Sequence, residues 1–562
     1  MRCGGGSSPV RAPGSPVRGS VAPVREPVFP ACVLVFPAAR RSSSAGVPSI
    51  LTSPPARRRM LPILPVMNEP SQSYPAGRLA VERAGGPPGL SPNTTQDAVV
   101  VVPGIMGSEL YDTEKDAVIW GLSPGLLLKA WTTPAGLGAL HLTPDEREGR
   151  LGRVRPSRLL RTAGWAPVLK GQEPYTELVR TVTRSVAAPE AVLEFPYDWR
   201  LSVATNARFL AQAAREHLER WRRHPAHTAA RRHRVDEREG RLVFVAHSMG
   251  GLLTLAALST GPDGDLAGDT RGVLTLGTPF QGAVAAAVIL NTGRGAPVPL
   301  PRGRLRSLAV TMPGLHDLLP TYPCVAEGAD IRALSPVDVA DLGGDKDLAV
   351  RSEAFHEGLR GRTLPGHRAV VGISQPTMQS LTLRQGVVTA YEHCYRYHRD
   401  GTLLTDGGTP RRFDVAGDGT VHKESASLTR GAVPFALQHG TLAKGEAAME
   451  AVTSFLAEDE HLGPTQAAAG MGLTVPDFVT PGADWTLRVH GADSPAGLEC
   501  TVEEVGTGSA VPVRAALYAD EDELAARVSV PASGLYRVTL DSGDRTPLTQ
   551  LVLAGPDDLV AD

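Results

Sequence analysis

The sequence predicts an α/β fold with a mostly parallel sheet, followed by a small C-terminal β-sandwich. Apolar strand-like segments alternate with helical patterns from residue 96 to about residue 457, which is the order typical of a parallel sheet. After residue 477 this order is replaced by short alternating runs, each predicted as a strand, at 485–490, 498–505, 513–518, 526–530, 535–540 and 548–554. The 562 residues, 42% of them hydrophobic, suffice for one large and one small core.

The first 95 residues carry 17 Pro and 10 Gly, a share that favours disorder over a packed core. We therefore expect folding to begin near residue 96. One hypothesis places the native start at Met60 or Met67, inside this tract. The predicted parts are a disordered extension (1–95), an α/β domain (96–457), a linker (458–476) and a β-sandwich (477–562).

Composition and charge argue against several classes of protein. A net charge of -2, from 57 basic and 59 acidic side chains, gives no electrostatic reason to expect a nucleic-acid partner. The five cysteines are scattered and lack metal-ligand spacing, so we expect no metal site, no disulfide framework and a reducing compartment. No apolar stretch approaches the roughly 18 residues that span a bilayer, and no clear signal peptide is found. The expected location is cytoplasmic.

Five apolar segments are predicted as the strands of the sheet: 98–102, 191–195, 241–246, 272–276 and 368–372. The segment 203–221, between the second and the third, has the apolar periodicity of a helix that packs on the sheet. We expect Phe209, Leu210, Ala213 and Leu218 near its inner face. A helix between two strands is the crossover connection that parallel pairing requires.

The stretch LVFVAHSMGGLLTLAAL (242–258) places a serine at the joint between an apolar strand and an apolar helix. A strand that ends in small-x-Ser-x-Gly can hold the serine in a strained turn, with its hydroxyl exposed above the sheet. Ala246 and Gly250 supply the small residues that close backbone approach requires. We predict Ser248 as a nucleophile; the alternative is a strand-to-helix loop with a capping serine.

A serine hydroxyl becomes a nucleophile when a histidine takes its proton and an acid orients that histidine, here in the chain order serine, acid, histidine. Asp418 lies in the glycine-flanked loop of RRFDVAGDGTV, and His439 lies between an apolar run and a predicted closing helix. We predict Asp418 as the acid and His439 as the base. His422, four residues after Asp418, is the alternative base.

The tetrahedral oxyanion of acyl transfer requires two backbone N–H donors. One is the N–H of Met249, directly after the serine. The other is expected in VVVVPGIMGSEL (99–110), where a glycine-containing turn follows the first strand, and we predict Ile105. The alternative is a plain Pro-Gly turn.

Several motifs together resemble the lecithin:cholesterol acyltransferase family of α/β-hydrolases, which includes lysosomal phospholipases and bacterial lipase-like members. They are VVPGIMGSEL, FPYDWR, VAHSMGG, LGTPFQG, AGDGTV and the late histidine, and the resemblance spans residues 98 to about 457. It implies a triad of Ser248, Asp418 and His439, with Ile105 and Met249 as oxyanion donors. The family often has an uncharged residue where His422 stands, so this position departs from the pattern.

The resemblance also implies a cap, at about 283–360, that covers the serine and shapes an acyl-binding channel. The apolar segment 125–142, with Trp131 near its middle, is interpreted as a packed helix; the alternative is a segment that dips into a lipid interface. The C-terminal β-sandwich contains no catalytic grouping, so we expect an interaction or stabilising role with an unknown partner.

The predicted function is a serine-dependent lipid ester hydrolase that acts through an acyl-enzyme, with no metal or organic cofactor. Hydrolysis is favoured over transfer to an alcohol because excluding water requires a specialised pocket. The alternatives are an O-acyltransferase, a serine peptidase and a non-catalytic binding or sensing module on the same fold.

Overall fold

The computed structural model describes residues 94–555 apart from several short segments. Those segments are 122–125, 127–132, 148, 161–174, 233–237, 260–265, 295–299, 399, 429–430, 460–461, 463–470, 477, 506–511, 521–522 and 544–546. The predicted N-terminal extension, up to residue 93, and Trp131 therefore lie outside the described residues.

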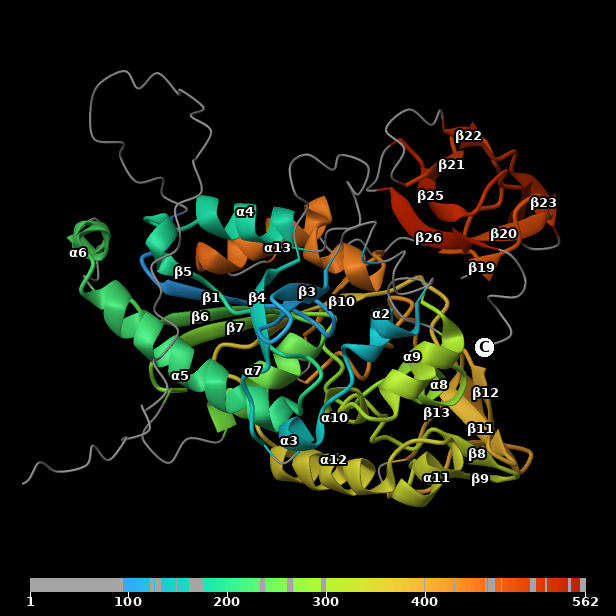
Figure 1. The fold of residues 1–562 in the computed structure, drawn as a ribbon, viewed down its shortest axis with the longest axis horizontal. Coiled ribbons are helices and arrows are strands. Elements are labelled where there is room, and N and C mark those ends of the chain that lie inside the picture. The colour runs from blue at the N-terminus through green and yellow to red at the C-terminus, as the bar shows by residue number, and fades with distance from the viewer. Residues whose placement is uncertain are drawn as a thin grey trace, which may run out of the picture. The chain divides into compact units, whose positions relative to one another are not determined.

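A six-stranded sheet in the order β17-β10-β7-β6-β1-β5 forms the centre of the α/β domain (Figure 1). Each neighbouring pair of strands is parallel. The strands are β1 (Ala98–Val102), β5 (Val192–Glu194), β6 (Leu242–His247), β7 (Thr270–Leu276), β10 (Arg368–Gly372) and β17 (Val433–Phe435). All five predicted strands are present; the largest difference is at β7, expected from residue 272 and observed from residue 270.

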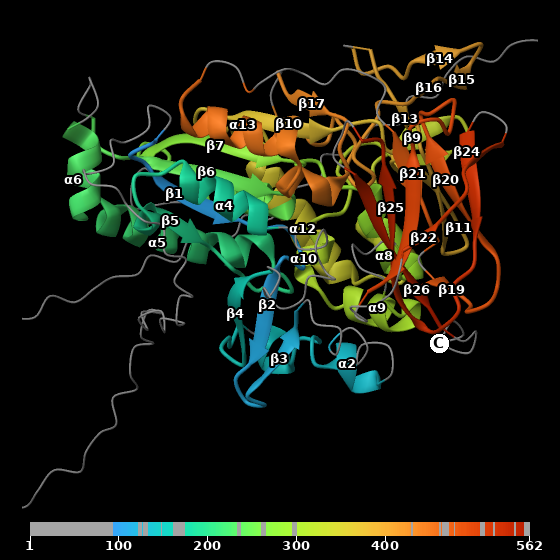
Figure 2. The same ribbon diagram turned by 90° about the horizontal axis from the view of Figure 1, so that it is seen from above.

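Helices cover both faces of this sheet (Figures 1 and 2). On one face lie α4 (Thr176–Arg184) and α13 (Glu446–Leu456), and on the other lie α5 (Val203–Arg222) and α7 (Met249–Ser259). Nine residues of α7 are buried, which explains why this helix is apolar all round instead of amphipathic.

The inner face of α5 corrects one expectation. Val203, Ala207, Leu210, Ala214 and Leu218 are buried, at spacings of three and four residues. Phe209, predicted to face the sheet, is 49% exposed, because one residue is about 100° of rotation away from Leu210 on a helix. Ala213 is half-buried beside the stripe.

Smaller elements connect and extend the sheet. After β1 come β2 (Ser108–Asp112), β3 (Ala117–Trp120), α2 (Pro134–Gly138), α3 (Pro144–Arg147) and β4 (Val154–Leu159), and α6 (Pro225–Arg232) follows α5. The segment predicted as a cap contains α8 (Val284–Thr292), α9 (Arg302–Ala309), α10 (Pro313–His316), β8 (Val325–Glu327), β9 (Asp330–Arg332), α11 (Pro336–Asp341) and α12 (Lys346–Leu359). Between β10 and β17 lie β11 (Ser380–Arg384), β12 (Val387–Tyr391), β13 (Cys394–Tyr395), β14 (Thr405–Asp406), β15 (Thr409–Pro410) and β16 (Arg412–Phe413).

The C-terminal strands form two sheets, in the orders β18-β20-β24-β23 and β19-β26-β25-β21-β22, that share one hydrophobic core. This is the predicted sandwich. The strands are β18 (Gly472–Thr474), β19 (Phe478–Val479), β20 (Trp485–His490), β21 (Glu499–Glu504), β22 (Val513–Arg514), β23 (Tyr518–Asp520), β24 (Glu523–Val528), β25 (Gly534–Asp541) and β26 (Leu548–Ala554).

Two details of this region differ from expectation. Strand β18 lies inside the segment 458–476 that was expected to be a linker, because it pairs with β20. The single strand expected at 513–518 is divided into β22 and β23, which belong to different sheets.

None of the helices in the described part of the chain combines the length and the apolar composition needed to cross a lipid bilayer.

Candidate active site

Ser248 lies at the turn between β6 and α7. Its φ of 54° falls in the left-handed region, which residues other than glycine rarely adopt. The serine N–H donates to the Leu276 carbonyl at the end of β7, at 2.9 Å. The turn therefore has the strained conformation that the sequence predicts.

The small residue at position 250 is required by a neighbouring strand. A Cβ atom on Gly250 would lie 2.5 Å from the Pro103 carbonyl oxygen and 2.6 Å from that of Val102. Both oxygens belong to the backbone, which cannot give way as a flexible side chain does. The backbone that comes closest to the start of α7 is thus the end of β1, and not β6, the strand that precedes α7 in the sequence.

Three side chains that lie far apart in the sequence meet at the carboxyl edge of the sheet. His439 Nε2 is 2.8 Å from Ser248 Oγ, and His439 Nδ1 is 2.7 Å from Asp418 Oδ2. Ser248 and Asp418 are buried, and the His439 side chain is 16% exposed. The predicted base is therefore within hydrogen-bond distance of both the predicted nucleophile and the predicted acid.

The backbone fixes the Asp418 carboxylate. Its Oδ1 accepts hydrogen bonds from the N–H groups of Thr420, at 2.9 Å, and Val421, at 2.7 Å, which leaves Oδ2 for the imidazole. The Asp418 carbonyl accepts from the His439 N–H at 2.8 Å, so the two loops are also joined through their backbones. Asp418 pairs with Gln375, which follows β10, although 42 residues separate the two positions in the chain.

The alternative base, His422, has a different environment. Its ring packs edge-on against Tyr322, with ring centroids 4.7 Å apart. Its Nδ1 accepts a long 3.4 Å contact from the Ser425 N–H, and its Nε2 has no partner among the described residues. Burial lowers the pKa of this imidazole to about 4. The structure thus brings His439, and not His422, into hydrogen-bond contact with Ser248.

The loop that contains Ile105 lies directly beside the serine. A Cβ atom on Gly104 would be 2.8 Å from Ser248 Cβ, so only glycine permits this approach. The Gly104 carbonyl accepts from the Gly107 N–H at 3.1 Å, which closes a tight turn around Ile105 and Met106. Ile105 borders the same cavity as Ser248. Met249, the other predicted donor, is the first residue of α7.

The FPYDWR motif contacts both ends of the loop that contains Ile105. The Tyr197 hydroxyl donates to the Pro103 carbonyl at 3.0 Å, and the Trp199 indole N–H donates to the Ser108 carbonyl at 3.2 Å. Arg200 is fully buried and bridges Asp198 and Glu146, at 2.7 and 2.8 Å.

Burial opposes ionisation of Glu146. Hydrogen bonds from the Thr143 N–H and from Arg200 nevertheless hold its pKa at about 2, so the buried arginine keeps an anionic partner. The FPYDWR motif is therefore, in this structure, a scaffold for the neighbouring loop.

A cavity of about 500 Å³ opens at Ser248. Many of its lining residues are aliphatic, and the segment predicted as a cap, which contains α8, α9 and α10, contributes a group of them. The wall residues include Ala286, Ile289, Leu305, Leu308, Met312 and Leu315. Leu473 and Leu551 from the C-terminal strands border it as well. Ser248, Asp418 and His439 thus border a predominantly apolar space.

Two buried residues beside the site were not predicted from the sequence. Tyr175 precedes α4 and contacts the Gly104 loop, and His247 directly precedes the serine. His247 was visible inside the HSMGG motif, but nothing in the sequence distinguishes it from a histidine that only packs. Tyr175 belongs to none of the recognised motifs.

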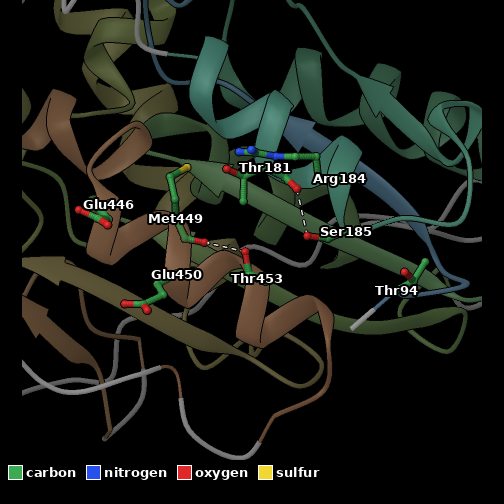
Figure 3. Close-up of a pocket in the computed structure, with 8 residues that line it drawn as sticks. All are labelled: Thr94, Thr181, Arg184, Ser185, Glu446, Met449, Glu450 and Thr453. Carbon is green, nitrogen blue, oxygen red and sulfur yellow. Dashed lines mark hydrogen bonds between the residues drawn. The ribbon is translucent and has the colours of Figure 1, made fainter. Parts of the chain in front are cut away.

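A second hollow, of about 360 Å³, lies between α4 and α13 (Figure 3). Two of its hydroxyl groups donate to backbone carbonyls four residues earlier in the sequence: Ser185 to Thr181 and Thr453 to Met449. Its charged lining residues are Arg184, Glu446 and Glu450. Among the described residues, no group of three or more His, Cys, Asp or Glu side chains is arranged to hold a metal ion.

The family profile of lecithin:cholesterol acyltransferase matches residues 166–333. No curated protein sequence matches the chain. A chain in the crystal structure of the Tle4-Tli4 complex is similar, with 16% identity over 64% of this chain and 96% of that chain, at a TM-score of 0.39. A superoxide reductase (neelaredoxin) from Ignicoccus hospitalis is similar, with 15% identity over 15% of this chain and 80% of its own, at a TM-score of 0.13.

At these TM-scores neither solved structure supports an argument about this chain. The family profile is different, because it matches a segment that contains FPYDWR, the serine turn and LGTPFQG. Together with the parallel sheet, it confirms the resemblance that the motifs indicate. The chain therefore has an α/β-hydrolase-like fold, and over residues 166–333 it is similar to the lecithin:cholesterol acyltransferase family.

Proposed function

We propose that this protein is a serine-dependent lipid ester hydrolase. One observation carries the proposal: two short hydrogen bonds join the Ser248 hydroxyl, the His439 imidazole and the Asp418 carboxylate, and all three groups border a predominantly apolar cavity. The family match supports, in general terms, a lipid ester hydrolase or acyltransferase. The wall of the cavity suits a hydrocarbon chain better than a polar substrate.

In the proposed reaction, Ser248 Oγ attacks the ester carbonyl while His439 Nε2 accepts the hydroxyl proton. Asp418 holds the Nδ1–H and stabilises the imidazolium that forms. The N–H groups of Ile105 and Met249 donate to the oxyanion. Collapse of the tetrahedral intermediate breaks the ester C–O bond, and His439 returns the proton to the departing alcohol.

Water then attacks the acyl-enzyme, His439 removes its proton, and the carboxylic acid leaves with Ser248 restored. An alcohol that takes the place of this water yields a new ester, and the enzyme is then an acyltransferase. Hydrolysis remains our proposal because a transferase must exclude water from the acyl-enzyme.

The test compares wild type with Ser248→Ala on p-nitrophenyl esters of short and long acyl chains and on phospholipid vesicles. We expect wild type to release fatty acid and to favour the longer chains. The variant should lose activity by about 10⁵-fold or more, down to background. Wild type should also be labelled by a fluorophosphonate, and the variant should not.

Two outcomes would contradict the proposal in different ways. Wild type that performs no better than Ser248→Ala on every ester, and takes up no label, indicates a non-catalytic binding module. Wild type that consumes the ester but forms a new ester with an added alcohol, while releasing little free acid, indicates a transferase.

A further inference from the structure

Two buried rings connect the loop beside the serine to the loop that carries the predicted base. The Gly104 N–H lies 2.7 Å from the Tyr175 hydroxyl oxygen. That oxygen lies 2.9 Å from His247 Nδ1, and His247 Nε2 lies 2.9 Å from the His439 carbonyl oxygen. The chain thus consists of three hydrogen bonds in series, and its ends are backbone groups of the two loops that face the reacting ester in the proposed mechanism.

Each hydrogen bond in this chain has only one chemically allowed direction. A backbone N–H can only donate, so the Tyr175 oxygen accepts from Gly104 and its own proton is free to point at His247 Nδ1. A carbonyl can only accept, so His247 must donate from Nε2 to His439. The two ends therefore fix the Nε2–H tautomer of His247.

Burial keeps both rings in these neutral forms. It lowers the pKa of His247 to about 3, with a further contribution from the nearby His439, and it raises the pKa of Tyr175. His247 is 5% exposed and Tyr175 is 2% exposed. Protons exchanged by His439 during turnover therefore leave the donor and the acceptor of each of these three hydrogen bonds unchanged.

This series of hydrogen bonds fixes the backbone on both sides of the serine. The Gly104 N–H is held by Tyr175 and the Gly104 carbonyl by the Gly107 N–H, so the peptide plane that carries the Ile105 N–H has a set orientation. On the other side, His439 donates its N–H to the Asp418 carbonyl and accepts from His247 at its own carbonyl. Both loops are anchored to one pair of side chains.

We infer that Tyr175 and His247 are positioning residues. Through this chain they hold the Ile105 N–H and the His439 imidazole in the mutual arrangement that the transition state requires. The inference rests on the proposed function, because it concerns the same reacting groups. It assigns no contact with substrate to either ring.

The first test is Tyr175→Phe, which removes one hydroxyl and keeps the ring. We expect kcat to fall by about 10- to 100-fold with KM unchanged within twofold, since displaced catalytic groups affect the transition state more than ground-state binding. The inhibition constant of a long-chain alkyl boronic acid, which forms a tetrahedral adduct with the serine, should rise by the same factor as kcat/KM falls.

Tyr536→Phe is the matched control. Tyr536 is also buried, and its hydroxyl donates to the Ala532 carbonyl at 2.9 Å within the C-terminal sandwich. We expect the two variants to lower Tm similarly, while only Tyr175→Phe lowers kcat. Wild-type kcat in Tyr175→Phe would overturn the inference, and so would equal losses of kcat in the two variants.

The second test compares His247→Gln with His247→Leu and remains available if Tyr175→Phe does not fold. Glutamine retains one acceptor and one donor, so it can partly replace the two ring nitrogens, whereas leucine has neither. We expect kcat to be at least threefold higher for the glutamine variant at equal KM. Equal kcat in both would contradict the inference.

These results are separable from a failure of the proposed function. Active wild type with an inactive Ser248→Ala supports that function whatever the positioning variants do. If wild type itself is inactive on every ester and does not react with fluorophosphonate, the proposed function fails, and the inference fails with it.

Discussion

Two histidines follow Asp418 closely in the chain, and their surroundings differ. His439 has both ring nitrogens hydrogen-bonded, one to a carboxylate and one to a hydroxyl, and its side chain is partly exposed to the cavity. His422 is 3% exposed, its Nε2 has no partner in the described part of the chain, and its ring rests against Tyr322.

The difference shows that nearness to an acid along the chain does not make a histidine a general base. A base requires one nitrogen that faces the proton to be moved and a partner that holds the other nitrogen. His439 has both. His422 has only the long contact from the Ser425 N–H at Nδ1 and no partner at Nε2 among the described residues. Burial also lowers its pKa to about 4, which makes it a weak base at neutral pH.

The largest expected effect on kcat distinguishes His439 from His422. His439→Ala should lower kcat by about 10⁴- to 10⁶-fold, because the serine loses the group that accepts its proton. His422→Phe, which keeps a ring of similar shape against Tyr322, should leave kcat within threefold of wild type. Steady-state kinetics on one long-chain ester measures both.

The opposite ranking would assign the base to the wrong histidine. Equal losses in the two variants would mean that the two histidines are coupled through the Asp418 loop, which carries His422 and hydrogen-bonds to His439, and the distinction drawn from their contacts would then fail.

Asp418→Asn should have the next largest effect, about 10³- to 10⁴-fold on kcat. The amide oxygen can still accept from Thr420 and Val421, so its NH₂ group faces His439 Nδ1 and favours the wrong tautomer. Circular dichroism and Tm should remain close to those of wild type. A loss below tenfold would show that the hydrogen bond to Nδ1 contributes little to orienting the base.

The smallest expected effect concerns stability in acid. His422 has a folded-state pKa of about 4, below the ordinary value near 6.5, so the unfolded chain binds the proton more readily. The stability that this group contributes is present above pH 6.5 and is lost as the pH falls toward 4. At pH 5 the loss from this one group is about 2 kcal/mol.

His422→Phe removes this titration. Urea unfolding at pH 7 and pH 5 should therefore show a smaller difference between the two pH values for the variant than for wild type. His217, whose pKa burial also lowers to about 4, titrates in both proteins and cancels in the comparison. Identical differences in the two proteins would contradict the low pKa of His422.

Local patterns allowed much of the fold and of the candidate site to be predicted from the sequence. The place of Ser248 at a strand-to-helix turn was predictable because such a turn restricts the residues around it. The place of His439 was predictable because an apolar strand precedes it and a helix follows it. Phe209 was assigned to the wrong face because several apolar residues on α5 compete for the same stripe, and only packing decides between them.

What was missed depends on contacts between distant segments. Tyr175 has no local signal, since its role arises only where the Gly104 loop and His247 approach it. The function of FPYDWR as a support was equally hidden, because Tyr197 reaches Pro103 across 94 positions of the chain. Periodicity and spacing report what one segment does, but not which remote backbone group it will meet.

The contact that forbids a side chain at residue 250 has a wider consequence. The backbone at the start of α7 lies so close to the backbone at the end of β1 that no side chain fits between them, so Ser248 and the loop after β1 are held at close range. In the proposed reaction, room for a bulkier acyl group would then depend on the separate helices α8 and α9, which contribute to the cavity wall. The proposed catalytic residues and the proposed selectivity thus belong to different stretches of polypeptide. The sequence of α8 and α9 can then change while the catalytic residues stay in place.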